Sequence, residues 1–177
     1  QHRCRAVRAA DDTDINELRE IREANPHIYT VQTSTSLTVG EYLNLDQHAR
    51  DNWFPVNPIL SSKTLTEGAG QVRAISRLAF DTAVRAGNML PLHNAVEDLY
   101  RLEEGGAPQA LRVIIVSTLA GGTGSGLILP VALYVRNFLR TRFRQSANIT
   151  RGFFILPEVL FEVVHGESER NNLKCNA

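Results

Sequence analysis

The chain of 177 residues lacks three features that mark large classes of protein. No stretch approaches the roughly 18 uninterrupted apolar residues of a membrane-spanning helix, so we expect no membrane insertion. Neither sign of charge dominates, because 19 Lys and Arg stand against 19 Asp and Glu. This balance argues against binding to nucleic acid through a general electrostatic attraction. The first ten residues carry three arginines and no apolar segment, so no secretory signal is visible.

Cysteine is scarce, and its placement excludes a disulfide framework. Cys4 and Cys175 lie near opposite ends of the chain, so a reducing cytoplasm is the expected location. Neither His93 nor His165 has a cysteine or a second histidine at metal-ligand spacing, so we expect no zinc site. The chain starts at Gln1 rather than Met and ends inside an expected helix, which indicates an internal piece of a longer protein.

The chain does have enough length and apolar content (43%) for one domain, residues 1–177, with a real core. We expect strands within 4–10, 28–40, 111–119 and 149–156, helices at 15–24, 72–86, 92–104 and 127–144, and an irregular stretch at 51–58. Strands thus alternate with helices, and the central strands are apolar on both faces. This pattern predicts an α/β fold, a three-layer sandwich with a mainly parallel sheet covered on both sides.

The most informative stretch is TLAGGTGSGLILP, residues 118–130, where an apolar strand meets four glycines within six residues. A strand, a glycine turn and a helix aim backbone N–H groups and the positive end of the helix dipole at one point, which favours an anion. Glycine lets a phosphate approach the backbone more closely than a Cβ allows. Thr123 and Ser125 add hydroxyl donors.

Two familiar phosphate loops do not fit this stretch. The P-loop needs a lysine and a hydroxyl residue after its last glycine, and here Leu127 and Ile128 follow. The dinucleotide fingerprint needs glycines at positions 1, 3 and 6. Counted from Gly121, position 3 is Thr123; counted from Gly122, position 6 is Leu127. The loop is neither motif.

A third pattern fits. AGGTGSG at residues 120–126 closely resembles the GGGTG[ST]G signature of the tubulin superfamily, which includes the bacterial division protein FtsZ. Only Ala120 departs from the signature. In that family the loop surrounds the nucleotide phosphates without a lysine.

Three further family landmarks follow the expected order. They are DTD at 12–14 after a strand, GAG at 68–70 before a helix with arginines, and a strand ending in proline at 152–157 before acidic and basic residues. The sequence GAGQ at residues 68–71, with Trp-Phe-Pro nearby, most resembles the divergent bacterial group called tubulin-like proteins.

The resemblance implies binding of GTP or GDP with Mg²⁺. It assigns phosphate contacts to Ala120, Gly121, Gly122, Thr123, Gly124, Ser125 and Gly126 with Gly68, Ala69 and Gly70, a Mg²⁺ or phosphate loop to Asp12, Thr13 and Asp14, and ribose contacts to Pro157, Glu158, Glu167 and Arg170. It also implies head-to-tail self-assembly into filaments, with GTP hydrolysis at the subunit interface. The family's base-contacting asparagine, its catalytic acid and its first strand and glycine loop fall outside the chain, so we expect no complete catalytic site and a fold truncated at both ends.

Other interpretations stay open. Asp12 and Asp14 also suit helix caps, and Arg73 and Arg77 a solvated helix face. The protein could be a non-polymerising nucleotide-binding regulatory domain. A Rossmann-like enzyme is a further alternative, with Asp11 or Asp12 at the ribose. The tubulin-like interpretation predicts that the loops at 12–14, 68–70 and 121–126 meet at one edge of the sheet. It also predicts that Gly124→Val abolishes nucleotide binding, because a Cβ would take the place of the phosphate and the backbone would resist a positive φ.

Overall fold

The computed structural model describes residues 6–10, 28–32, 37–55, 57–64, 69, 72–101, 110–144 and 147–176. The elements are β1 (Ala6–Ala10), β2 (Ile28–Gln32), α2 (Val39–Leu45), α3 (Gln47–Asn52), α4 (Pro58–Ser61), α5 (Arg73–Arg85), α6 (Leu90–Arg101), β3 (Ala110–Thr118), α7 (Gly122–Arg142), β4 (Ala147–Ile155), η3 (Pro157–Leu160) and α8 (Glu167–Asn176). The helix expected at 15–24 lies outside these residues.

The strands form two parallel pairs. β1 pairs with β2, with Ala6 opposite Ile28. β3 pairs with β4, with Thr118 opposite Ile155 at their carboxyl ends. Within the described residues no ladder joins the two pairs. An α/β fold with parallel strands is therefore confirmed, whereas the strands form two small sheets rather than a single one.

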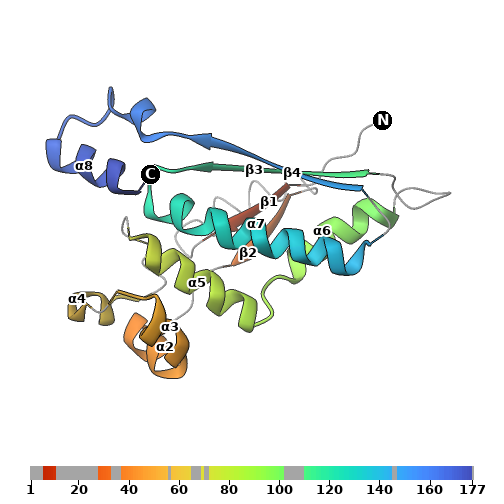
Figure 1. The fold of residues 1–177 in the computed structure, drawn as a ribbon, viewed down its shortest axis with the longest axis horizontal. Helices are drawn as coiled ribbons and strands as arrows, with labels where there is room; N and C mark the ends of the chain where they lie inside the picture. Colours follow the sequence, from red (N-terminus) through yellow and green to blue (C-terminus); the bar gives the residue numbers. More distant parts are fainter. Residues whose placement is uncertain are drawn as a thin grey trace.

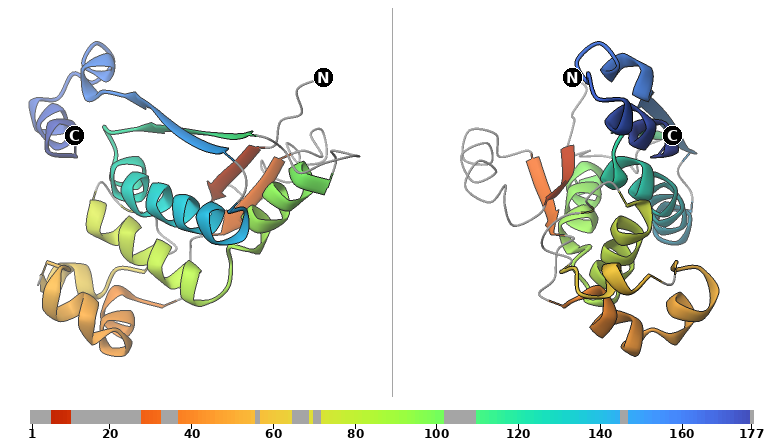
Figure 2. Two further views of the ribbon diagram at one scale, coloured as in Figure 1. Left: turned by 45° about the vertical axis from the view of Figure 1, so that its right-hand side comes forward. Right: turned by 90° about the vertical axis from the view of Figure 1, so that its left-hand side faces the viewer.

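The helices form layers below β3 and β4 (Figures 1 and 2). α7 runs beneath the β3–β4 pair, α5 packs along α7, and α2 to α4 lie on the far side of α5. The helix expected at 72–86 is confirmed as α5, and its apolar spacing is the reason: Ile75, Leu78 and Ala83 are buried on one stripe.

Three hydrophobic clusters tie these layers together. α2, α3 and α5 share the first cluster, which centres on Val39 and Ile75. In the second, Val31 of β2 meets residues of α5 and α7. In the third, Val96 of α6 packs with Leu139 and its neighbours on α7. The helix α7 therefore contributes to two of the three clusters, which fixes its position under the strands.

The outer face of the β3–β4 pair is open among the described residues. Residues opposite each other in parallel strands share a face, and this face exposes Ile114, Val116, Ile149, Phe153 and Ile155. The expectation that 149–156 forms a buried strand is wrong, because β4 is exposed on both faces: Phe154, on the side opposite to Phe153, is 45% exposed as well.

Several boundaries differ from the expectations. α6 begins at Leu90 rather than Leu92, and its expected end at Glu104 lies outside the described residues. α2 and most of α3 occupy residues 39–50, where no helix was expected, and α3 and α4 reach into the two ends of the stretch expected to be irregular, 51–58. Most important for the site, α7 begins at Gly122 instead of near Leu127, so most of the glycine stretch is helical.

Candidate functional site

The turn between β3 and α7 is only three residues long, Leu119–Gly121. The Leu119 N–H donates to the Ile155 carbonyl at 2.9 Å. The Ala120 N–H donates to the Thr118 hydroxyl oxygen at 3.2 Å. The turn is thus anchored to the carboxyl ends of both β3 and β4.

The first turn of α7 has backbone amides that lack a hydrogen-bond acceptor within the described structure. The first donor that bonds back along the chain is the Ser125 N–H, which reaches the Gly121 carbonyl at 3.2 Å. The amides of Gly122, Thr123 and Gly124 therefore have no intrahelical acceptor, and no side chain caps them in the described structure. The Ser125 hydroxyl donates to the same Gly121 carbonyl at 2.6 Å, while Thr123 is exposed. Three uncapped amides at the positive end of a 21-residue helix favour an anion.

The glycines of this stretch have different surroundings. A Cβ on Gly121 would meet nothing within 4 Å. A Cβ on Gly124 would overlap the Thr118 carbonyl and lie 2.6 Å from the Ser117 hydroxyl oxygen. Gly124 thus allows the helix to approach the end of β3, and the described glycine with a positive φ is Gly87 instead. The expected reason for its sensitivity, a Cβ in the place of the phosphate, is therefore corrected: the Cβ would strike the strand.

The start of α5 also meets the loop. A Cβ on Gly126 would overlap the Arg73 carbonyl and lie 2.9 Å from the Ser76 Cβ. Because α5 follows the GAG landmark, this contact brings that part of the chain beside the signature loop. Ala69 is buried, and its carbonyl accepts from the Val72 N–H at 2.9 Å.

The family model described as tubulin-like matches residues 11–177. The chain belongs to the tubulin-like family. The match covers all four landmarks and confirms the resemblance. Neither the curated proteins nor the solved structures yielded a match.

The tubulin-like landmarks that the structure describes lie at one end of the strands (Figure 1). The glycine loop follows β3, Pro157 follows β4, and the two strands end opposite each other. The remaining landmark residues, Asp12, Thr13, Asp14, Gly68 and Gly70, lie outside the described residues. The convergence of all three loops therefore stays a prediction.

The residues assigned to the ribose lie just beyond β4. Pro157 is buried at the start of η3, whereas Glu158 and Glu167 are exposed. The Arg170 guanidinium donates to the carbonyls of Val164 at 2.6 Å and Phe161 at 2.7 Å. Arg170 thus ties α8 to the turn after η3, and its contact with ribose stays a prediction.

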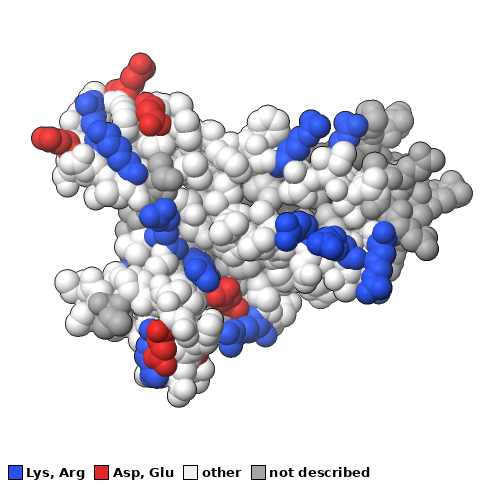
Figure 3. Space-filling model, viewed as in Figure 1, with Lys and Arg blue, Asp and Glu red and all other residues white. Residues whose placement is uncertain are grey.

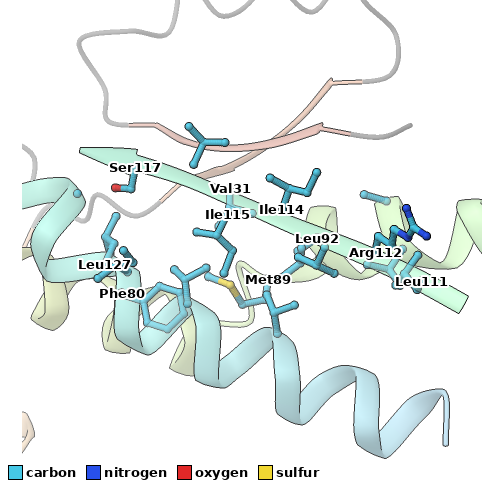
Figure 4. Close-up of a pocket in the computed structure, with 18 of the residues that line it drawn as sticks. Val31, Phe80, Met89, Leu92, Leu111, Arg112, Ile114, Ile115, Ser117 and Leu127 are labelled. Atoms are coloured by element: carbon cyan, nitrogen blue, oxygen red, sulfur yellow. The ribbon is translucent and has the colours of Figure 1, made fainter. Parts of the chain in front are cut away.

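A cavity of 460 Å³ lies beneath β3 (Figure 4). Val31, Phe80, Met89 and Ile115 give it a mainly apolar lining, and the glycine loop reaches one end through Thr123 and Gly124. The cavity has few polar side chains, Arg112, Ser117 and Thr123, so most of a phosphate group placed there would lose hydration against apolar side chains. The open amides of α7, rather than this cavity, are the candidate phosphate site of the tubulin-like chain.

The described residues show neither a candidate metal site nor a candidate membrane-spanning helix. They contain no group of three or more His, Cys, Asp or Glu side chains that could hold a metal. His93 packs between α6 and α7, where its Nε2 lies 2.9 Å from the Tyr134 hydroxyl. Nor does any helix of the described chain combine the length and apolarity that a membrane span requires.

Sequence reasoning missed the residues that support the loop from behind. Ser117 and Thr118 lie directly against Gly124, and Arg73 and Ser76 lie directly against Gly126. A serine and a threonine at the end of a strand bond readily to nearby backbone, which was a usable signal for Thr118. Arg73 was noted only for its side chain, and nothing in the local sequence marked its carbonyl or Ser76, because their contact with Gly126 joins two helices.

Proposed function

We propose that this tubulin-like chain binds the phosphates of a guanine nucleotide, GTP or GDP, through residues 120–126. The observation that carries the proposal is the set of three uncapped amides at the start of α7, next to the empty space at Gly121. Amides and a helix dipole can hold phosphate without a lysine, which agrees with the absence of lysine from this loop.

The rest of the pocket follows the family pattern in this proposal. Gly68, Ala69 and Gly70 add phosphate contacts, and the start of α5 already touches the loop at Gly126. Asp12 and Asp14 suit Mg²⁺ or its waters, since carboxylates are the preferred ligands of this hard cation. Pro157, Glu158 and Glu167 lie at the strand end expected to face the ribose.

We further propose that the protein assembles head to tail in the cytoplasm. A nucleotide held between subunits makes a heterologous interface, which extends in a line. Hydrolysis would need an acid from the next subunit to position water, while loop amides and Mg²⁺ stabilise the developing charge. If the purified protein binds GTP but stays monomeric, the proposal of head-to-tail assembly is wrong, and the protein is the non-polymerising regulatory domain instead. Family membership leaves the Rossmann-like alternative without support.

The proposal includes the three-layer form of the fold. The cavity of 460 Å³ is lined by β3 and, from the other strand pair, by Val31 of β2. Its apolar lining suits the side chains of the further strand that the family resemblance adds to the sheet. The exposed apolar face of β3 and β4 would then be covered by the third layer.

The deciding experiment is calorimetric titration of GTP and ATP, each with Mg²⁺, into the full-length protein and its Gly121→Val variant. A Cβ at position 121 would meet no described atom within 4 Å, so the variant should melt within a few degrees of the parent yet bind GTP at least ~100-fold more weakly. Gly124→Val is the packing control: it should lose stability and binding together. Unchanged GTP affinity in a folded Gly121→Val protein would remove the loop from the site.

A further inference from the structure

The outer face of α7 carries exposed cations beside exposed leucines. Leu129 and Leu133 are 64% and 47% exposed, and Arg136 and Arg140 follow on the same face. This arginine stripe, Leu129, Leu133, Arg136 and Arg140, spans about 16 Å along the helix. Neither arginine has an ion pair within the described structure, whereas Arg142 pairs with Glu97 at 3.4 Å. The cations of the stripe are therefore available to an external partner.

A second surface has the opposite charge and the same apolar character. η3 and the turn after it expose Val159 and Val163, at 66% and 73%, next to Glu158 and Glu162. Glu167 and Glu169 of α8 continue this acidic patch. The nearby cations are partly engaged: Arg170 bonds two carbonyls, and the Lys174 ammonium lies 5.4 Å from the centre of the Phe161 ring.

The two surfaces cannot meet within one molecule. The arginine stripe lies along α7 beneath the strands, and the acidic patch lies beyond the carboxyl end of β4 (Figures 1 and 2). Figure 3 shows blue side chains over α7, and red side chains with a blue one between them over the region of η3 and α8. Each surface offers an apolar pair flanked by charges, and the charges are opposite in sign.

We propose that the arginine stripe of one molecule docks on the acidic patch of a second copy. Val159 and Val163 would pack on Leu129 and Leu133, and the glutamates would face Arg136 and Arg140. Such a contact uses different surfaces on the two partners, so it continues along an open chain of molecules. The contact rests on the self-assembly part of the proposed function. It does not involve residues 120–126, but Glu158 and Glu167 at the edge of the patch are also assigned to the ribose, so among the glutamates the test substitutes Glu162 and Glu169 only.

Charge reversal tests the pairing. Full-length protein is followed by sedimentation velocity with GTP and Mg²⁺, as the parent, Arg136→Glu/Arg140→Glu, Glu162→Arg/Glu169→Arg, and the combination of all four. Each double variant should raise the dissociation constant of self-association at least ~10-fold, since like charges then face each other. The combined variant, and an equimolar mixture of the two doubles, should return to within ~3-fold of the parent. Arg50→Glu/Lys63→Glu, at α3 and after α4, is the matched control and should leave association unchanged.

The remaining outcomes overturn the proposal. A monomeric parent would do so, as would a combined variant no better than the doubles, or a glutamate double with parental association. If only the arginine double changed behaviour, through lost binding to single-stranded DNA or to phosphatidylserine vesicles, the stripe would serve a polyanion instead. GTP titration of the same variants distinguishes the nucleotide site from the docking contact. If GTP does not bind, the proposed nucleotide site is wrong. If the combined variant regains self-association, the docking contact is still supported.

Discussion

At the scale of single residues, Gly121 and Gly126, five positions apart, differ in what an added methyl group would contact. A methyl on Gly126 would meet the backbone of α5 at Arg73, and a methyl on Gly121 would meet open space. Backbone atoms cannot rotate away, so Gly126→Ala should lower the free energy of unfolding by about 2 kcal/mol. Gly121→Ala should change it by about 1 kcal/mol or less. Urea unfolding of both variants checks this, and equal losses would contradict the packing role of Gly126.

Asp81 gives a prediction about pH. Burial raises the pKa of its carboxyl, and the guanidinium groups of Arg77 and Arg85 oppose that rise without cancelling it. A pKa above the unfolded value means that this group stabilises the fold at low pH and loses that contribution as pH rises through the folded pKa. Asp81→Asn should therefore raise the free energy of unfolding at pH 7, by less than about 1 kcal/mol because the group is partly exposed.

The same comparison at lower pH supplies the control for Asp81. As pH falls through the raised pKa of the native carboxyl, that group becomes protonated as well, so the difference between Asp81→Asn and the parent should shrink. Urea unfolding across this range measures it. A variant less stable than the parent at pH 7 would show that the two arginines outweigh burial.

At the scale of elements, the short helices α2 to α4 depend on their caps. Thr38 and Glu41 form a capping box at α2, and Asn57 caps α4 ahead of a proline. Asp46 caps α3 through the Ala49 N–H at 3.1 Å and also pairs with Arg85 of α5 at 2.7 Å. This buried carboxylate thus fastens the small helices to the central one.

Replacing Asp46 separates its two roles. Asp46→Ala removes the cap and the ion pair, and should lower the free energy of unfolding by about 2–4 kcal/mol. Asp46→Asn keeps a good capping side chain but loses the charge, so roughly half of that loss is expected. Thermal and urea unfolding measure both variants. Equal losses would mean that the cap contributes nothing.

At the scale of the whole molecule, the open face of β3 and β4 tests the three-layer proposal. Val116 is exposed on this face, so Val116→Lys should change the stability of the 177-residue chain by about 0.5 kcal/mol or less. In the full-length protein a covering layer would bury the lysine, and a loss of at least about 3 kcal/mol is expected. Unfolding of both proteins decides. A similarly small effect in the two would leave the face without a third layer.

The sequence by itself determined the local features of this protein. The period of apolar residues in 72–86 located α5, and the β-branched run of 111–119 located β3, because burial on one stripe or in a strand needs these spacings. The AGGTGSG motif pointed to the family, which the match over residues 11–177 confirmed. The capping signals before α2, α3 and α4 were present as well, but their short apolar patterns do not stand out without the neighbouring α5.

Only the tertiary structure decided how the glycine stretch is used. Gly124 and Gly126 lie where the end of β3 and the start of α5 come too close for a Cβ, and the sequence does not show either close approach. α7 begins at Gly122 and not near Leu127, where the sequence predicted its start, because glycines permit a helix to begin where a strand end and a second helix lie this close. Exposure of β4 was equally beyond its apolar sequence, because burial depends on what packs against a strand and not on the strand alone.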